Sequence, residues 1–141
     1  LDRFLIKSSV GYPTAEDEKK IIISDDKVLK NKELRRLKEE TLSLWIDEYK
    51  NVFIDDGILD KLISVFRKTR NGENFTLGVS PRAAQKLVKA LKASAYIHKR
   101  DFVSKDDIFD LFLPVLAHRV IAKEEGNEGE ILLELLKAEN I

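Results

Sequence analysis

Apolar residues recur at steps of three and four along most of this chain, and this periodicity restricts the possible fold more than any other feature. The longest run consists of Leu34, Leu37, Thr41, Leu44, Trp45 and Tyr49. A second run extends from Ile58 to Thr69 and a third from Ala84 to Ala95. Such spacing is typical of amphipathic helices that bury one face. The sequence therefore predicts a helical protein.

Residues that favour helix N-termini stand in front of these runs. The predicted caps are Thr14 with Asp17 three residues later, Asp55 or Asp56, Ser80, and Ser104 with Asp107 three residues later. A short first helix is expected to carry the three isoleucines at positions 21–23, and an acidic last helix is expected within 127–140. Pro114 has no N–H to donate, so we expect it to kink or restart the helix that follows Ser104.

Strand content is expected to be minimal. Residues 51–54 and 101–103 are short and extended, and we expect at most a two-stranded β clip between them. Residues 71–78 contain two glycines and are expected to form an exposed loop. Residues 4–10 alternate like a strand severed from its sheet, which predicts poor order or a borrowed partner edge. The predicted fold class is all-α, a helical bundle.

Composition excludes several kinds of chemistry. No apolar run approaches roughly 18 residues, and no signal-peptide pattern is present, so a cytoplasmic protein without membrane contact is expected. The absence of cysteine excludes disulfides, thiol nucleophiles and Cys-ligated metals. The two histidines, His98 and His118, are far apart in the sequence, so no metal site is expected. We expect both histidines at helix ends, where an imidazolium suits the negative end of the helix dipole.

Catalytic motifs are missing as well. No glycine pair has the spacing of a phosphate-binding P-loop, and no serine stands in a G-x-S-x-G turn. Residues 42–48, LSLWIDE, resemble a strand that presents Asp47 to magnesium and Glu48 to water, but the helical period continues through them. We therefore expect these residues to be helical and this chain to be inactive alone.

The segment from Pro81 to Arg100 is distinctive because it holds six basic residues and no acidic one. Arg82, Lys86 and Lys89 share one face of the predicted helix, opposite its apolar side. A cation in the first turn opposes the helix dipole unless an anion is bound there, and phosphate suits both the guanidinium and the free N–H groups. The alternatives are a solvated surface, a DNA-reading helix over 81–100, and an adaptor that binds only protein.

Six stretches of this sequence together resemble a known family. LDRF, GYP, VFI, LGVSPRAAQKLVKALKASA, RDFVSKDDI and VLAHRV occur in the order and spacing of the C-terminal part of MoxR-type AAA+ ATPases. The resemblance implies that residues 1–13 are a remnant of the AAA+ core, with the arginine-finger motif and the last core strand. It implies that residues 14–141 form the helical lid, so that the chain is a fragment of a longer ATPase.

The resemblance also implies roles for two arginines. Arg3 matches the arginine finger, which acts in trans on the γ-phosphate held by a neighbouring subunit. Arg82 matches the sensor-2 arginine, which contacts nucleotide phosphate, either in its own subunit or in the neighbour. ATP and Mg²⁺ are the implied cofactors of the parent protein. The Walker A and B motifs are absent from this chain, so neither tightly bound cofactor nor turnover is expected in it.

The implied partners follow from the same family. They are the AAA+ core of the same chain, neighbouring subunits in a ring that is typically hexameric, and a client protein that ATP hydrolysis remodels or matures. Von Willebrand A-type proteins are among such clients. Nucleic acid is not an expected partner, because the basic residues are spread around the helix and the formal net charge of the chain is +0.

Overall fold

The computed structural model describes residues 3–23, 37–124 and 126–141, and most of them are helical. The elements are α1 (Ala15–Ile23), α2 (Glu39–Glu48), the 3-10 turn η2 (Tyr49–Asn51), α3 (Asp56–Lys68), β1 (Phe75–Leu77), α4 (Pro81–Ile97), α5 (Lys105–Leu116), the 3-10 turn η3 (Ala117–Arg119), β2 (Ile121–Ala122) and α6 (Glu128–Ala138). The predicted fold class, a helical bundle with a small two-stranded sheet, is confirmed.

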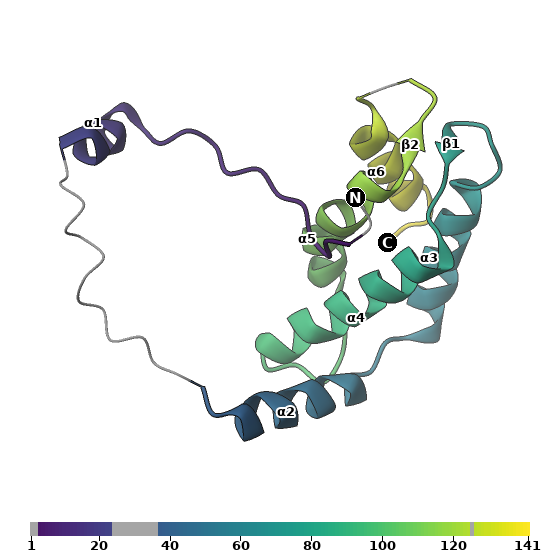
Figure 1. The fold of residues 1–141 in the computed structure, drawn as a ribbon. Helices are drawn as coiled ribbons and strands as arrows, with labels where there is room; N and C mark the ends of the chain where they lie inside the picture. Colours follow the sequence, from purple (N-terminus) through teal and green to yellow (C-terminus); the bar gives the residue numbers. More distant parts are fainter. Residues whose placement is uncertain (1–2, 24–36, 125) are drawn as a thin grey trace.

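The core lies where α4, α5 and α6 meet. α4 packs along α5, while α6 contacts both α3 and α5 (Figure 1). The fully buried side chains at this junction include Leu87, Leu91, Ile108, Phe112, Leu132 and Leu136. Burying one such side chain contributes about 1.5–3 kcal/mol. This core holds α4, the basic helix, in a fixed orientation.

The helix caps explain where the helices begin. Asp55, rather than Asp56, caps α3, since its Oδ1 accepts hydrogen bonds from Gly57 N and Ile58 N. Ser80 caps α4 through a bond from Ala83 N, and Ser104 forms a complete capping box with Asp107 at the start of α5. Each of these caps satisfies donors that a helix leaves unpaired at its N-terminus.

The N-terminal part differs from the bundle in burial. α1 begins directly after Thr14, as predicted, but none of its residues is buried, and Figure 1 shows it standing apart from the other helices. The predicted helix from Leu34 to Tyr49 is described only from residue 37 on, where it forms α2 and η2. Residues 4–10 form no strand, although their main chain bonds to the end of α5 and to η3.

The strand predictions require correction. Residues 71–78, predicted to be an exposed loop, contain β1, which pairs antiparallel with β2 and buries Phe75 to 2% exposure. The predicted clip between 51–54 and 101–103 is a single parallel bridge at Phe53 and Phe102, with Phe53 N donating to the Asp101 carbonyl at 2.7 Å. The two-stranded sheet forms at β1 instead, where Phe75 pairs with Ala122 from a distant part of the chain.

The structure tests two further predictions about helices. α5 continues through Pro114 to Leu116, so of the predicted kink or restart the restart is excluded. The buried residues around Pro114, namely Phe112, Val115 and Leu116, hold the helix in place despite the missing hydrogen bond. In α4 the buried face consists of Ala83, Leu87, Ala90, Leu91 and Ala95, whereas Ala84 and Val88, predicted to face inward, are only half-buried.

A close contact fixes the turn that leads into α4. A Cβ added at Gly78 would lie 2.3 Å from the carbonyl oxygen of Thr69, so only glycine fits at this position. The buried Thr69 hydroxyl donates to the Phe66 carbonyl at 2.7 Å and accepts from Val79 N at 3.0 Å. The end of α3 therefore determines where the first turn of α4 is placed.

Candidate anion-binding site

The basic residues near the start of α4 line a hollow of about 460 Å³. Its lining residues are Arg3, Arg82, Gln85, Lys86 and Lys89. The last four lie at helical spacing on one face of α4, and Arg3 comes from the N-terminal segment. Among the residues that the structure describes, the lining thus contains four cationic side chains and no carboxylate, and one of the four, Lys86, already has an interaction partner. The structure therefore brings together both arginines that the sequence singles out.

The electrostatics of this hollow favour an anion. Arg82 is exposed, and none of residues 3–23, 37–124 or 126–141 forms a hydrogen bond or an ion pair with its side chain. Its main-chain N–H is among the donors that a helix leaves unpaired at its first turn. An anion here would relieve the repulsion among the cations and receive charge-assisted hydrogen bonds, each worth about 1.5–3 kcal/mol. The hollow fits phosphate oxygens, and no lining carboxylate offers a ligand to Mg²⁺.

Two other basic residues of the 81–100 segment, Lys92 and Arg100, have structural partners. Lys92 Nζ donates to the carbonyl of Lys50 at 3.0 Å, which ties α4 to η2. Arg100 donates two hydrogen bonds to Asp107, from Nη1 to Oδ2 at 2.6 Å and from Nη2 to Oδ1 at 2.8 Å. These contacts reduce the basic surface available to DNA, and the exposed cations of α4 that line the hollow, Arg82 and Lys89, lie in its N-terminal half.

Asp107 is the centre of a buried polar network that links the end of α4 to the start of α5. Its side chain is 2% exposed and also accepts hydrogen bonds from Ser94 Oγ at 2.7 Å and Ser104 N at 2.9 Å. Burial raises the pKa of Asp107, but the bonds from Arg100, Ser104 and Ser94 outweigh it and hold the pKa well below its usual range. From the sequence, Asp107 is predicted only as part of a capping box with Ser104.

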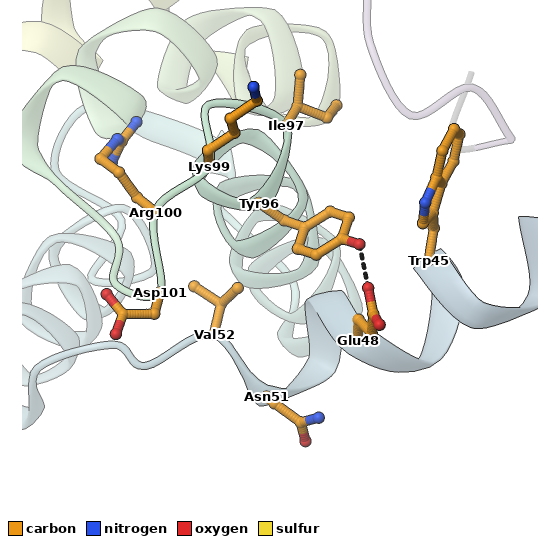
Figure 2. A pocket seen from close by; sticks show the side chains of 9 residues that line it. All are labelled: Trp45, Glu48, Asn51, Val52, Tyr96, Ile97, Lys99, Arg100 and Asp101. Carbon is orange, nitrogen blue, oxygen red and sulfur yellow. Dashed lines mark hydrogen bonds between the residues drawn. The ribbon is translucent and has the colours of Figure 1, made fainter. Parts of the chain in front are cut away.

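A second hollow, of about 700 Å³, lies between α2 and the C-terminal end of α4 (Figure 2). Trp45 and Tyr96 stand on opposite sides of it, and Ile97 is largely exposed at its edge. The Tyr96 hydroxyl donates to Glu48, and this bond raises the pKa of the tyrosine. Trp45 was predicted on a packing face, yet it is 41% exposed and no residue of α2 is buried.

The histidines lie where the sequence predicts them. His98 is the C-terminal cap residue of α4, with Nδ1 2.9 Å from the Ser94 carbonyl, and His118 lies in η3 directly after α5. Within the described ranges, no three or more histidine or acidic side chains cluster in a way that would hold a metal ion. The helices described here are all too short or too polar to span a bilayer.

The fold and the site together define a class of domain. A small helical bundle that presents exposed cations at the capped start of a helix is suited to close over a bound anion held by another part of a protein. Its sequence contains neither a P-loop nor a G-x-S-x-G turn.

Comparisons with known proteins identify the family. Residues 67–135 match the AAA lid domain family. The chain is 37% identical to the uncharacterized protein YeaC of Bacillus subtilis over 98% of this chain and 45% of that protein. It is 28% identical to Chaperone MoxR1 of Mycobacterium tuberculosis, over 96% of this chain and 38% of that protein. The chain therefore spans less than half the length of these relatives.

A solved structure supports the fold. The crystal structure of a Cytophaga hutchinsonii protein, described as a candidate ATPase, superposes with a TM-score of 0.75 at 24% identity, over 96% of this chain and 46% of that chain. Residues 67–135 match the AAA lid domain family and the relatives include a MoxR chaperone, so the comparisons support the helical lid region of a MoxR-type AAA+ protein as the class of this chain. The family resemblance stated from the sequence is thereby confirmed.

Proposed function

We propose that the hollow at the start of α4 contacts the phosphates of ATP bound by an AAA+ core. In this proposal Arg82 is the sensor-2 arginine and Arg3 is the arginine finger. The observation that carries the proposal is that four cations line one hollow beside the capped end of a helix, with no carboxylate among the described lining residues. Such a hollow suits the several negative oxygens of a polyphosphate.

Because Arg3 and Arg82 share one hollow, the position of Arg3 indicates whether Arg82 contacts the nucleotide of its own subunit or that of a neighbouring subunit. An arginine finger stabilises charge on the nucleotide of a neighbouring subunit. Arg3 and Arg82 line the same hollow, so one anion is within reach of both. We therefore propose that both arginines act in trans, on the nucleotide held by the adjacent subunit of a ring.

The remaining functional assignments follow from this role. The core of the longer protein would supply the P-loop and the Mg²⁺ site, and loss of the γ-phosphate would release one anchor of the lid and shift its position. We propose that the ring, typically hexameric in this family, uses this shift to remodel client proteins in the cytoplasm. Von Willebrand A-type proteins are candidate clients. The exposed apolar surface around Trp45 and Ile97 is available for a protein contact.

Pyrophosphate binding to this chain tests the proposed site. Calorimetric titration at low ionic strength is expected to show binding that Arg82→Gln weakens about tenfold or more, because a charge-assisted bond is lost. The matched control is Lys99→Gln, which makes the same change of charge at the opposite end of α4 and should leave the Kd within about twofold. If both substitutions weakened pyrophosphate binding equally, the binding would depend on the overall charge of the chain and not on a site at Arg82.

A further inference from the structure

The VLAHRV stretch has no role in the proposed phosphate site, yet its arginine makes long-range contacts. Arg119 lies in η3 and is only 8% exposed. Its Nε donates to the Val115 carbonyl at 2.7 Å, and its Nη2 donates to the carbonyls of Phe4 and, at 3.3 Å, Leu5. The guanidinium therefore bridges the last turn of α5 and the N-terminal segment, which is 114–115 residues away in sequence.

Two further contacts hold the same segment. The Nε2 of His118 lies 3.2 Å from the Phe4 carbonyl, and Lys7 N donates to the Pro114 carbonyl at 2.8 Å. The side chains of residues 3–10 are all exposed, so little apolar burial holds this segment in place. Polar contacts to the main chain are therefore the principal interactions that fix its path. Arg119 supplies two of them, since its planar fork presents several donors at once.

These contacts determine where Arg3 lies. Consecutive Cα atoms are about 3.8 Å apart, so fixing the Phe4 carbonyl restricts the main chain of Arg3 to a small volume. Arg3 in turn lines the hollow at Arg82. Without the tether, an exposed segment with so few contacts would sample many positions, and the Arg3 guanidinium would spend little time near that hollow.

We propose that Arg119 is a positioning residue for the anion site, which holds the N-terminal segment by its carbonyls and so keeps Arg3 beside Arg82. The inference rests on the proposed function, because it assumes that Arg3 contacts the same phosphate. It adds to that function a link between the lid and the arginine finger. The alternative is that Arg119 only closes the end of α5 through its bond to Val115.

The first experiment measures the order of the segment without any ligand. Heteronuclear NOE values of ¹⁵N-labelled chain should be high for residues 3–5 in the native protein and should fall in Arg119→Lys, because a lysine does not span two carbonyls. The values for α4 should stay the same. Low values in the native chain, or values unchanged by Arg119→Lys, overturn the tether whether or not the hollow binds anions.

The second experiment is a double-mutant cycle with pyrophosphate as the probe. Arg119→Lys should weaken binding about fivefold in the native background and less than about 1.5-fold when Arg3→Gln is already present. Such non-additivity means that Arg119 acts through Arg3. Equal weakening in both backgrounds would assign Arg119 a purely structural role and overturn the inference.

Two controls separate loss of positioning from loss of stability. Glu139→Ala removes the contacts of the residue after α6 with Ser64 and Lys68 of α3, none of which involves the N-terminal segment, and should lower the melting temperature without changing the pyrophosphate Kd. If Arg119→Lys does not fold, His118→Ala removes the second donor to Phe4 and should show the same dependence on Arg3. Native chain that binds no pyrophosphate would refute the proposed function, while the NOE comparison would still decide the tether.

Discussion

Asp107 and Arg100 illustrate how individual residues join separate elements. The carboxylate is buried and all of its contacts come from two helix ends, with Arg100 and Ser94 on one side and Ser104 on the other. A buried carboxylate is tolerated only when its oxygens are hydrogen-bonded. This network therefore fixes the angle at which α5 leaves α4. Arg82, by contrast, has no such partner in the described residues, which is why it suits a ligand.

Replacing Asp107 should therefore cost stability in a pH-dependent way. Asp107→Asn leaves the half-buried Arg100 without its partner, and we expect unfolding to become easier by about 3 kcal/mol at pH 7. Because the folded pKa of Asp107 is depressed, its contribution is present above the usual pKa of an aspartate, about 3.9, and is lost as the pH falls below that value. Urea unfolding of the native chain should show that the free energy of unfolding falls as the pH falls below that value. In Asp107→Asn, this dependence of the free energy of unfolding on pH should be smaller.

The exposed neighbour Asp106 provides the control for this prediction. Asp106→Asn changes the same charge in the same helical turn without a buried contact, so it should cost less than about 0.5 kcal/mol. Equal costs for the two substitutions would show that charge at the helix start, rather than the buried network, matters.

Two helices of similar amphipathic pattern have opposite environments. α4 buries five residues, largely against α5, whereas α2 buries none and exposes Leu42, Leu44, Trp45 and Ile46. α2 is attached through η2, the Lys92 bond to Lys50, and the Tyr96 bond to Glu48. An apolar helix face that the described chain leaves uncovered is typical of a surface that contacts another protein or domain.

Replacing a large apolar side chain with alanine should therefore lower the free energy of unfolding much less in α2 than in α4. Trp45→Ala is expected to change the free energy of unfolding by less than about 0.5 kcal/mol, since the indole is not buried. Leu87→Ala, in the fully buried face of α4, is expected to cost about 3 kcal/mol through lost burial and a residual cavity. Chemical denaturation of both variants measures the difference, and a Trp45→Ala cost close to that of Leu87→Ala would show that α2 packs in solution.

At the scale of the whole molecule, the main feature is the meeting of the two chain regions that carry Arg3 and Arg82. They are far apart in sequence, but they line one hollow, and Arg119 ties the first region to the end of α5. In the proposed ring, this arrangement makes the lid and the arginine finger a single unit. Their movements toward a neighbouring nucleotide would then be coupled.

Subunit mixing in the longer ATPase tests this arrangement. Rings mixed from Arg3→Ala and Arg82→Ala subunits should stay inactive if both arginines act in trans, because every interface then lacks one of them. Recovery of ATPase activity would mean that Arg82 acts in its own subunit, since a site with both arginines could then form. Mixing either variant with native subunits is the positive control, and neither substitution should lower the melting temperature appreciably, because both side chains are exposed.

The helices and their beginnings were predictable from the sequence because their causes are local. Ser80 and Ser104 act on N–H groups three residues away, and apolar spacing reports a helical face directly. Arg82 was identified for a similarly local reason, a cation at a helix start. The roles of Arg3 and Arg82 on nucleotide, and the division at residues 13 and 14, remain predictions that depend on the family resemblance.

The pairing of distant segments was decided only by the tertiary structure. β1 pairs with β2, Arg119 bonds to Phe4, and Arg3 lines the same hollow as Arg82 through contacts between segments far apart in the sequence, which no short-range pattern encodes. The same reason explains the error at Trp45: periodicity reveals that a helix has an apolar face, but not what covers it. The sequence by itself determined the helices and their caps, whereas packing determined the sheet, the buried Asp107 network and the cationic hollow.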